Sequence, residues 1–263
     1  MSRIQEAFRA AKRERRPALL AYLMAGDPSL DATERLVHAC ARGGADVVEL
    51  GVPFSDPIAD GSEIQQASQR ALRAGTRTKD VLSLVSRLRD SSDLPLVLMT
   101  YLNPVLALGV DAFADRATKA GVDGVILPDL SLEESDEIRR VFDARGLDHI
   151  QLVAPSTPEE RAKRIGEASR GFLYVVARYG TTGARAELPV DLSERLRVLR
   201  RVTTLPLAVG FGVSMKSHVH SLVSMGVDGV VVGSAIVRRA AEDPDPERIE
   251  GFVRELASGL HGP

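Results

Sequence analysis

The stretch Gly226-Val-Asp-Gly-Val-Val-Val-Gly233 has two close relatives in the same chain, Gly44-Ala-Asp-Val-Val-Glu-Leu-Gly51 and Gly121-Val-Asp-Gly-Val-Ile-Leu-Pro128. Each begins with a glycine suited to end a helix, because glycine enters the left-handed region without a Cβ penalty. An aspartate then precedes a short apolar run, which is typical of a strand buried on both faces of a parallel sheet. The repeat therefore predicts a parallel α/β fold.

Five more apolar runs make eight predicted strands in all, the added ones at residues 18–24, 96–101, 149–154, 172–177 and 207–211. Segments with helical spacing alternate with them, at 34–41, 81–88, 134–144, 158–168 and 193–202. This alternation favours closure into a barrel over an open doubly wound sheet, which usually has fewer strands. No linker divides the chain, so we expect a single (β/α)₈ TIM barrel domain over residues 1–263, with an extra N-terminal helix.

The charge balance limits the possible partners. The 34 basic and 36 acidic residues leave a net charge of −2, and nucleic acid or an anionic membrane would need a basic surface.

The one cysteine, Cys40, excludes an intramolecular disulfide and is expected to be a buried thiol. We see no signal peptide and no membrane span, so we expect a cytoplasmic location.

Two stretches interrupt the alternation, residues 53–61 after the second strand and 178–189 after the sixth. The loops that follow the strands of such a barrel form its catalytic face. Long loops in a compact domain are usually functional or mobile. Chemistry is therefore expected in these two loops and at the strand ends beside them.

The strand end and loop Glu49-Leu-Gly-Val-Pro-Phe-Ser-Asp-Pro-Ile-Ala-Asp60 contain two candidate acid–base groups. A glutamate among apolar strand neighbours should point into the barrel mouth and titrate above its solution pKa, which suits proton transfer near neutral pH. Asp60 could face the same cavity from another wall. Simpler interpretations are an ion pair for Glu49, and for Asp60 a turn with Gly61 or a cap on a helix starting near Ser62.

Glycines follow the seventh and eighth strands, in Gly210-Phe-Gly212-Val-Ser214 and in Gly233-Ser-Ala-Ile236 at the start of a short helix. Free amides at a helix start, with no Cβ to block approach, form the usual phosphate site of this barrel class. A dinucleotide fingerprint is absent, because Met215 stands where its last glycine would be. The histidines lack metal-ligand spacing, so we expect no metal site.

The stretch Glu49-Leu-Gly-Val-Pro-Phe-Ser-Asp-Pro-Ile-Ala-Asp-Gly-Ser-Glu-Ile-Gln65 closely resembles the signature of tryptophan synthase α chains. The similarity continues in the family's order through Ala25-Gly-Asp-Pro28, Met99-Thr-Tyr-Leu-Asn-Pro104, Leu127-Pro-Asp129, Thr182-Gly-Ala-Arg185, Gly210-Phe-Gly212 and Gly233-Ser-Ala-Ile236. The resemblance implies a lyase of tryptophan biosynthesis, classed as a carbon–oxygen lyase. Its aldolase-type step splits indole-3-glycerol phosphate into indole and D-glyceraldehyde 3-phosphate.

The resemblance also implies a role for each matched residue. Glu49 resembles the general acid/base that protonates indole C3, and Asp60 the carboxylate that accepts the indole N–H. The implied substrate-binding residues are Tyr22 and Phe211 around the ring, Ile64, Met99, Ile126 and Tyr174 in the pocket, Thr182 beside Asp60, and Gly183, Gly212, Gly233 and Ser234 at the phosphate. This sequence departs from the family's usual residues at Met24, at Ser62 and in the loop that begins at Arg178. None of these departures replaces one of the two acids or a phosphate-binding glycine.

The implied partner is the tryptophan synthase β chain, in an α₂β₂ heterotetramer. Pyridoxal phosphate belongs to that β chain, so no cofactor is expected here. The loop at residues 53–61, around Asp56, is the implied β-facing surface. Three alternatives stay open: a standalone indole-glycerol-phosphate lyase, a catalytically silent regulatory partner of the β chain, and a sugar-phosphate isomerase or epimerase barrel. The carboxylate pair and the apolar pocket speak against the last.

Overall fold

A computed structural model of the chain describes residues 2–177, 191–210 and 212–261. Within those ranges the strands are β1 (Ala18–Met24), β2 (Val47–Gly51), β3 (Leu96–Met99), β4 (Gly124–Ile126), β5 (Asp148–Ile150), β6 (Leu152–Val153), β7 (Leu173–Val176), β8 (Leu207–Gly210) and β9 (Gly229–Val232). The helices are α1 (Arg3–Arg13), α2 (Leu30–Arg42), α3 (Ser62–Arg73), α4 (Thr78–Arg89), α5 (Leu102–Leu108), α6 (Val110–Ala120), η1 (Leu132–Glu134), α7 (Asp136–Asp143), α8 (Glu159–Ala168), α9 (Leu192–Val202), α10 (Lys216–Ser224), α11 (Ser234–Glu242) and α12 (Pro246–Ala257).

The strands form one parallel sheet in the order β5-β4-β3-β2-β1-β9-β8-β7-β6. β5 and β6 are two halves of the single strand predicted at residues 149–154, separated by Gln151. The first half pairs with β4 and the second with β7, so the two ends of the sheet are joined through Gln151. The carbonyl of Gln151 also accepts a hydrogen bond from the Tyr174 amide at 3.0 Å. The predicted barrel with an extra N-terminal helix is confirmed.

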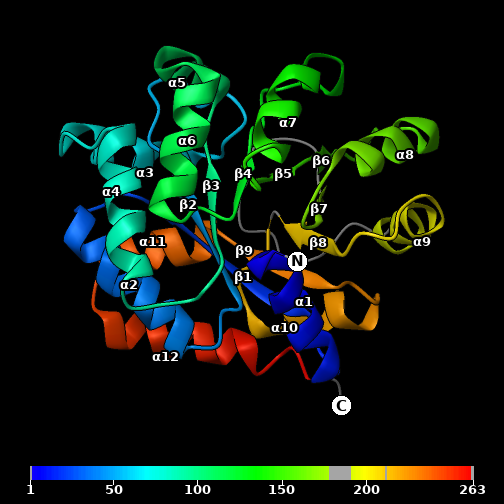
Figure 1. Cartoon of the computed structure of the whole chain (residues 1–263). Coiled ribbons are helices and arrows are strands. Elements are labelled where there is room, and N and C mark those ends of the chain that lie inside the picture. The colour runs from blue at the N-terminus through cyan, green and yellow to red at the C-terminus, as the bar shows by residue number, and fades with distance from the viewer. Residues whose placement is uncertain (1, 178–190, 211, 262–263) are drawn as a thin grey trace.

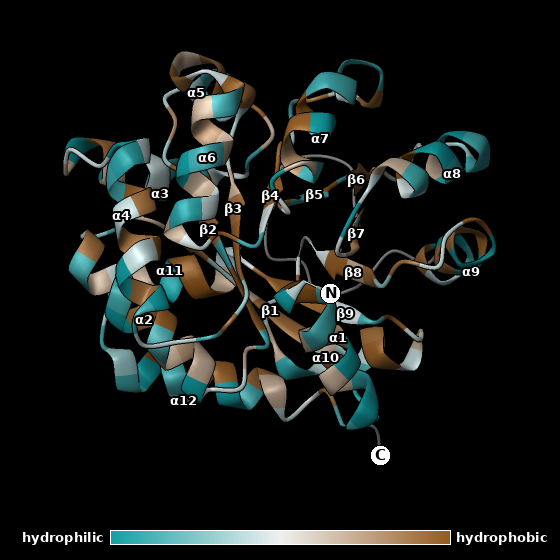
Figure 2. Cartoon of the chain, in the orientation of Figure 1, coloured by the Kyte–Doolittle hydropathy of each residue, from teal (hydrophilic) through white to brown (hydrophobic). Residues whose placement is uncertain are grey.

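Apolar side chains fill two layers, one inside the barrel and one between the strands and the helices. On β2, Val47 belongs to the interior cluster, while Val48 and Leu50 belong to the outer one. Ile4 and Phe8 of α1 pack into the interior cluster, so α1 covers one end of the barrel. Figure 1 shows α1 in front of the strands with the other helices around them. The strands are mainly hydrophobic and the helices carry hydrophilic stripes (Figure 2).

The aspartate of the threefold sequence repeat makes the same contact each time. Asp46, Asp123 and Asp228 stand just before their strands, and each carboxylate accepts from the main-chain amide of a preceding strand. The donors are Leu19, Leu96 and Leu207, at 2.8, 2.8 and 2.7 Å. Each aspartate also pairs with an arginine that precedes its partner strand: Arg16, Arg89 and Arg200 respectively. The repeat therefore joins neighbouring strands at their amino ends.

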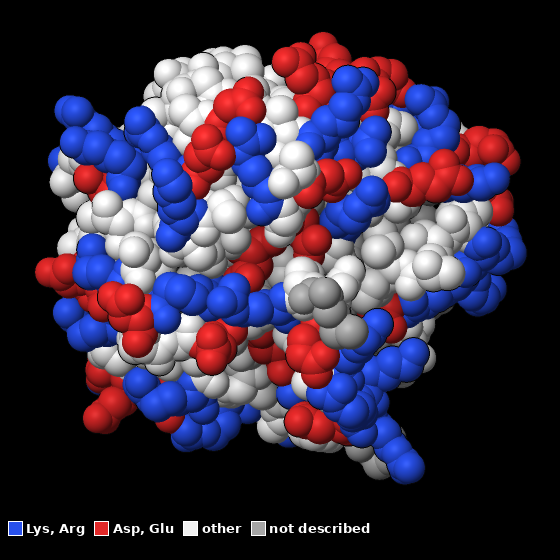
Figure 3. All heavy atoms as spheres, in the orientation of Figure 1, with Lys and Arg blue, Asp and Glu red and all other residues white. Residues whose placement is uncertain are grey.

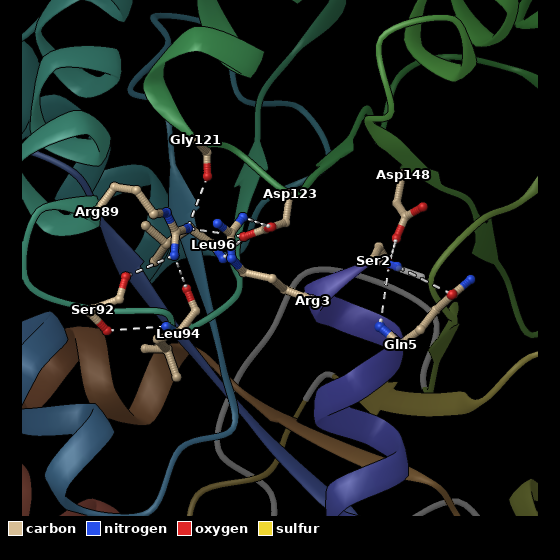
Figure 4. Close-up of polar contacts among 10 residues, drawn as sticks. All are labelled: Ser2, Arg3, Gln5, Arg89, Ser92, Leu94, Leu96, Gly121, Asp123 and Asp148. Carbon is tan, nitrogen blue, oxygen red and sulfur yellow. Dashed lines mark hydrogen bonds and ion pairs between the residues drawn. The ribbon is translucent and has the colours of Figure 1, made fainter.

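The same contacts attach α1 to the barrel, as Figure 4 shows. Asp123 lies between Arg89 and Arg3. Its Oδ1 is 3.0 Å from the Arg3 guanidinium, and its Oδ2 is 3.0 Å from the Arg89 guanidinium. The Ser2 hydroxyl donates to the Asp148 carboxylate at 2.6 Å. This end of the barrel is thus occupied by a helix and its ion pairs. The opposite rim, at the carboxyl ends of the strands, is left for a binding site.

Candidate active site

A cavity opens at the carboxyl ends of the strands. Its lining comes from strand ends, from the start of α3, and from the segment that leads into α11. The lining residues are Tyr22, Asp60, Gly61, Ser62, Glu63, Ile64, Met99, Tyr174, Gly212, Val213, Ser214, Val231, Gly233, Ser234, Ala235 and Arg238. The lining therefore combines the carboxylates of Asp60 and Glu63 with several glycine and serine residues.

Most of the residues singled out in the sequence meet at this cavity. Tyr22, Asp60, Ile64, Met99, Tyr174, Gly212, Gly233 and Ser234 line it. Glu49 and Ile126 are fully buried in the strands and are not part of the lining. Thr182, Gly183 and Phe211 lie outside the described residues.

Glu49 is a carboxyl group in an apolar interior. The side chain is 0% exposed, and neither carboxyl oxygen has a hydrogen-bond partner among the described residues. It shares the inward face of β2 with Val47, and Tyr22 and Val97 are its neighbours in the sheet register. Loss of hydration on burial raises the pKa of Glu49 to about 8. An ion pair with Lys or Arg, the simpler interpretation, is absent among the described residues.

Asp60 occupies the end of the loop that follows β2. Burial raises the pKa of the Asp60 carboxyl to about 6, and a hydrogen bond from the Tyr101 side chain works in the opposite direction. The residue that caps α3 is Gly61, with no side-chain cap bond, so Asp60 does not serve as a helix cap. The side chain is available to a ligand because it lines the cavity.

Tyr101 was not assigned a role from the sequence, although it lies in a motif that carried the resemblance. Its hydroxyl accepts a hydrogen bond from the Ala59 amide at 3.0 Å and donates to the neighbouring Asp60 carboxylate. Its ring stacks on Phe54, with centroids 5.1 Å apart. Tyr101 therefore fixes both ends of the loop at residues 53–61. Tyr101 follows β3 and contacts this loop only because the folded chain brings the two segments together. The spacing of residues along the sequence does not predict that contact.

Two tyrosines of the cavity lining each lie against a glycine at the end of a strand. The Tyr22 hydroxyl lies where a Cβ at Gly51 would stand, and the Tyr174 hydroxyl occupies the equivalent place at Gly210. A Cβ at either glycine would come within 2.0 and 2.3 Å of those oxygens, so glycine is required for this close approach. Burial, together with the negative charges of Glu49 and Asp60, raises the pKa of Tyr174. Both carboxyls are therefore close enough to influence the same phenol.

The main chain around Gly212 and Gly233 in the lining is suited to an anion. Gly212 has a φ of +96°, a conformation that side chains with a Cβ rarely adopt. Gly233 caps α11, and the first amides of that helix point out of its N-terminus. The Ser214 amide donates to Nδ1 of the buried His218 at 3.3 Å, so His218 holds this loop in place. His220, two residues later, is exposed, so the two histidines face different sides of α10.

Other kinds of site receive no support from the part of the chain that is described. Within it, no group of three His, Cys, Asp or Glu residues is placed to hold a metal ion. No described helix is both long enough and apolar enough to span a membrane. On the face seen in Figure 3, basic and acidic side chains are interspersed.

Comparisons with known proteins agree with this geometry. A family model described as the tryptophan synthase alpha chain matches residues 8–258. The tryptophan synthase alpha chain of Solibacter usitatus is 46% identical over 264 residues, covering 99% of this chain and 98% of that one. A solved tryptophan synthase from Mycobacterium tuberculosis superposes with a TM-score of 0.91 at 38% identity, covering 98% of each chain. A tryptophan synthase complex from Pyrococcus furiosus gives a TM-score of 0.87 at 38% identity, covering 92% of this chain and 98% of that one.

Proposed function

The chain belongs to the tryptophan synthase alpha chain family, and we propose that it cleaves indole-3-glycerol phosphate into indole and D-glyceraldehyde 3-phosphate. The observation that carries the proposal is one cavity lined both by the Asp60 carboxylate and by Gly212, Gly233 and Ser234. A substrate with an indole ring and a phosphate on its side chain needs both a carboxylate for the ring and main-chain amides for the phosphate. The activity proposed is an aldolase-type cleavage of a carbon–carbon bond, within a tryptophan synthase that is classed as a carbon–oxygen lyase.

The two acids divide the proton transfers. With a pKa of about 8, Glu49 is mostly protonated at neutral pH and can give its proton to indole C3. With a pKa of about 6, Asp60 is mostly ionised there and can accept the indole N–H. Its fixed negative charge stabilises the ring cation that forms on protonation of C3. When the environments of two carboxyls give them different pKa values, the one with the higher pKa can be assigned as the acid and the other as the ionised partner.

The bond between indole C3 and the adjoining glyceryl carbon then breaks. Its electron pair returns to the ring, which restores neutral indole. The hydroxyl on the departing carbon becomes the aldehyde carbonyl, and its proton goes to the Glu49 carboxylate. Glu49 thereby regains the proton that it gave, so substrate and products balance with no other reactant.

Binding roles complete the proposal. Tyr22 and Phe211 would enclose the ring, with Ile64, Met99, Ile126 and Tyr174 around it. The phosphate would rest on the main chain of Gly183, Gly212, Gly233 and Ser234, and Thr182 would lie beside Asp60. The support for the described members of this set is their position on the cavity wall, or beneath it for Ile126. No cofactor on this chain is required, because the two carboxyls supply the proton transfers.

We further propose a β-chain partner in an α₂β₂ assembly, with the pyridoxal phosphate on the β chain. The relative from Pyrococcus furiosus is a tryptophan synthase complex. In this chain, Ile58 in the loop at residues 53–61 is 79% exposed and Leu106 of α5 is 53% exposed. Leu106 belongs to a groove that is also lined by Phe54, by other residues of α5 and by the basic Arg77, Lys79 and Arg116. Exposed apolar side chains such as Ile58 and Leu106 favour a protein contact. A single domain over residues 1–263 and a cytoplasmic location are part of the same proposal.

The test is an indole-release assay with indole-3-glycerol phosphate, with and without a tryptophan synthase β chain. We expect slow cleavage by the chain alone and a large activation by the β chain. Equal rates in both conditions would indicate a standalone lyase. No release in a complex whose β chain still works would indicate a silent regulatory partner. Turnover of sugar phosphates without indole release would indicate an isomerase.

A further inference from the structure

Arg238 is the one basic residue among the described residues that line the cavity. It lies in α11, four residues after Ser234, and therefore one turn further along the same face of the helix. Side chains of an α-helix tilt toward its N-terminus. The Arg238 side chain is thus placed to reach back toward the amides at the start of α11, where the phosphate is expected.

The charges of the lining make a cation necessary there. Asp60 and Glu63 both line the cavity, whereas its uncharged polar groups are main-chain amides, serine hydroxyls and the phenols of Tyr22 and Tyr174. A phosphate ester brings close to two negative charges into this space. Arg238 is the only described lining side chain that can offset them. An arginine also offers several N–H donors in a plane that matches phosphate oxygens.

Neighbouring arginines are already engaged, and Arg238 is not. Arg239 lies over the Phe252 ring, with its guanidinium carbon 3.9 Å from the ring centroid. Arg70, on the adjacent helix α3, pairs with Asp27 at 2.8 Å. Arg238 makes no hydrogen bond or ion pair with any other described residue. Its guanidinium can therefore turn toward a ligand without breaking a contact in the described part of the protein.

We propose that Arg238 binds the phosphate group of the substrate and gives the site its preference for phosphomonoesters. This role rests on the proposed function for the identity of the substrate, but the ligand class follows from the cavity itself. Arg238 acts in binding, away from indole C3, so its contribution is the same before and during bond cleavage. It should lower KM and leave kcat unchanged.

The test compares Arg238→Gln, Arg238→Lys and a matched control, Arg239→Gln, which removes the same charge from the same helix outside the cavity. Inorganic phosphate binding is titrated by calorimetry, and steady-state kinetics are measured with indole-3-glycerol phosphate. For Arg238→Gln we expect phosphate affinity to fall about tenfold and KM to rise about tenfold, with kcat unchanged. Arg238→Lys should recover most of the affinity, and Arg239→Gln should match the wild type in both measurements.

Equal effects of Arg238→Gln and Arg239→Gln would overturn the proposal, because only the overall charge would then matter. So would a wild type that does not bind inorganic phosphate, or an Arg238→Gln variant that lowers kcat at unchanged KM. Failure of the proposed function has a different signature: the wild type would bind phosphate without releasing indole. Phosphate binding by Arg238→Gln would still decide the role of Arg238 in that case.

Discussion

Tyr22 of β1 lies directly opposite Glu49 of β2 in the register of the barrel. Burial first, and then the negative charges of Asp60 and Glu49, raise the pKa of the Tyr22 phenol. Tyr22 lines the cavity, so a ring bound against it would lie close to both acids. This relationship connects the buried Glu49 to the open part of the site.

Glu49→Gln should nearly abolish indole release and leave substrate binding in place. Glutamine keeps the size of the side chain but cannot give and retake a proton, and general acid–base catalysis contributes about 10²–10⁴ in rate. Steady-state kinetics and a binding titration with indole-3-glycerol phosphate check this. Glu63→Gln is the control, since it removes a carboxylate from the cavity lining without changing the proposed acid. Turnover by Glu49→Gln near the wild-type rate would remove Glu49 from the mechanism.

The same variant should become more stable than the wild type as pH rises. The pKa of Glu49 is 4.5 in a model chain and about 8 in the folded protein, so the folded state binds a proton that the unfolded state has lost. Wild-type stability therefore falls between pH 4.5 and 8, by about 1.4 kcal/mol per pH unit, and Glu49→Gln lacks this loss. Urea unfolding of both proteins from pH 4 to 9 measures the difference. A difference that does not change with pH would mean that Glu49 is not buried as an acid.

Wild-type kcat/KM should follow a bell-shaped pH profile. Activity requires ionised Asp60, with a pKa of about 6, and protonated Glu49, with a pKa of about 8. Tyr101→Phe removes the hydrogen bond that lowers the pKa of Asp60, so the acid limb should move to higher pH while the alkaline limb stays. A pH–rate series on both proteins checks this. Movement of the alkaline limb alone would contradict the assignment of the two acids.

Gly233→Ala should fold normally and bind phosphate poorly. A Cβ at Gly233 would lie 3.5 Å from Tyr22, an ordinary contact, so the protein itself has room for it. That room is on the cavity wall where the phosphate is expected. KM should rise roughly tenfold, which corresponds to the loss of about one hydrogen bond to a charged group. Gly251→Ala in α12, with open space around it, is the control. An unchanged KM would place the phosphate elsewhere.

Asp123→Asn should destabilise the barrel without slowing the enzyme. It weakens two ion pairs at the amino ends of the strands, with Arg3 and Arg89, of which Arg3 is half exposed. We expect a loss of about 2 kcal/mol in the free energy of unfolding and an unchanged kcat. Thermal unfolding and the indole-release assay on one preparation check both. A fall in kcat with intact stability would connect this end of the barrel to the chemistry.

The apolar runs predicted the positions of the strands along the chain well, because a strand buried on both faces leaves a continuous hydrophobic signature. The fifth strand was predicted as one piece, yet it is divided at Gln151, where the chain changes partners from β4 to β7. Helices α5, α6 and α12 were not predicted. α5 is short and contains Pro104, which is tolerated only because it lies in the first turn.

The sequence predicts those residues of the site whose role can be recognised from their neighbours along the chain. Glu49 among apolar neighbours, and glycines at two strand ends, indicate acid and anion sites from spacing alone. Tyr101 and Arg238 were missed, because a tyrosine near a strand end and an arginine on a helix are common in any sequence. Their importance comes from what the fold places beside them: the Ala59 amide in one case and the cavity in the other.

In the proposed mechanism, two acids and a phosphate site act on one bound substrate. A crystal structure of the Glu49→Gln variant with bound indole-3-glycerol phosphate tests this most directly. We expect the indole N–H to donate to Asp60, ring carbon C3 to face residue 49, and the phosphate to lie on the amides of Gly233 and Ser234. A phosphate bound in another pocket, or an indole ring out of reach of Asp60, would contradict the proposed placement of the substrate.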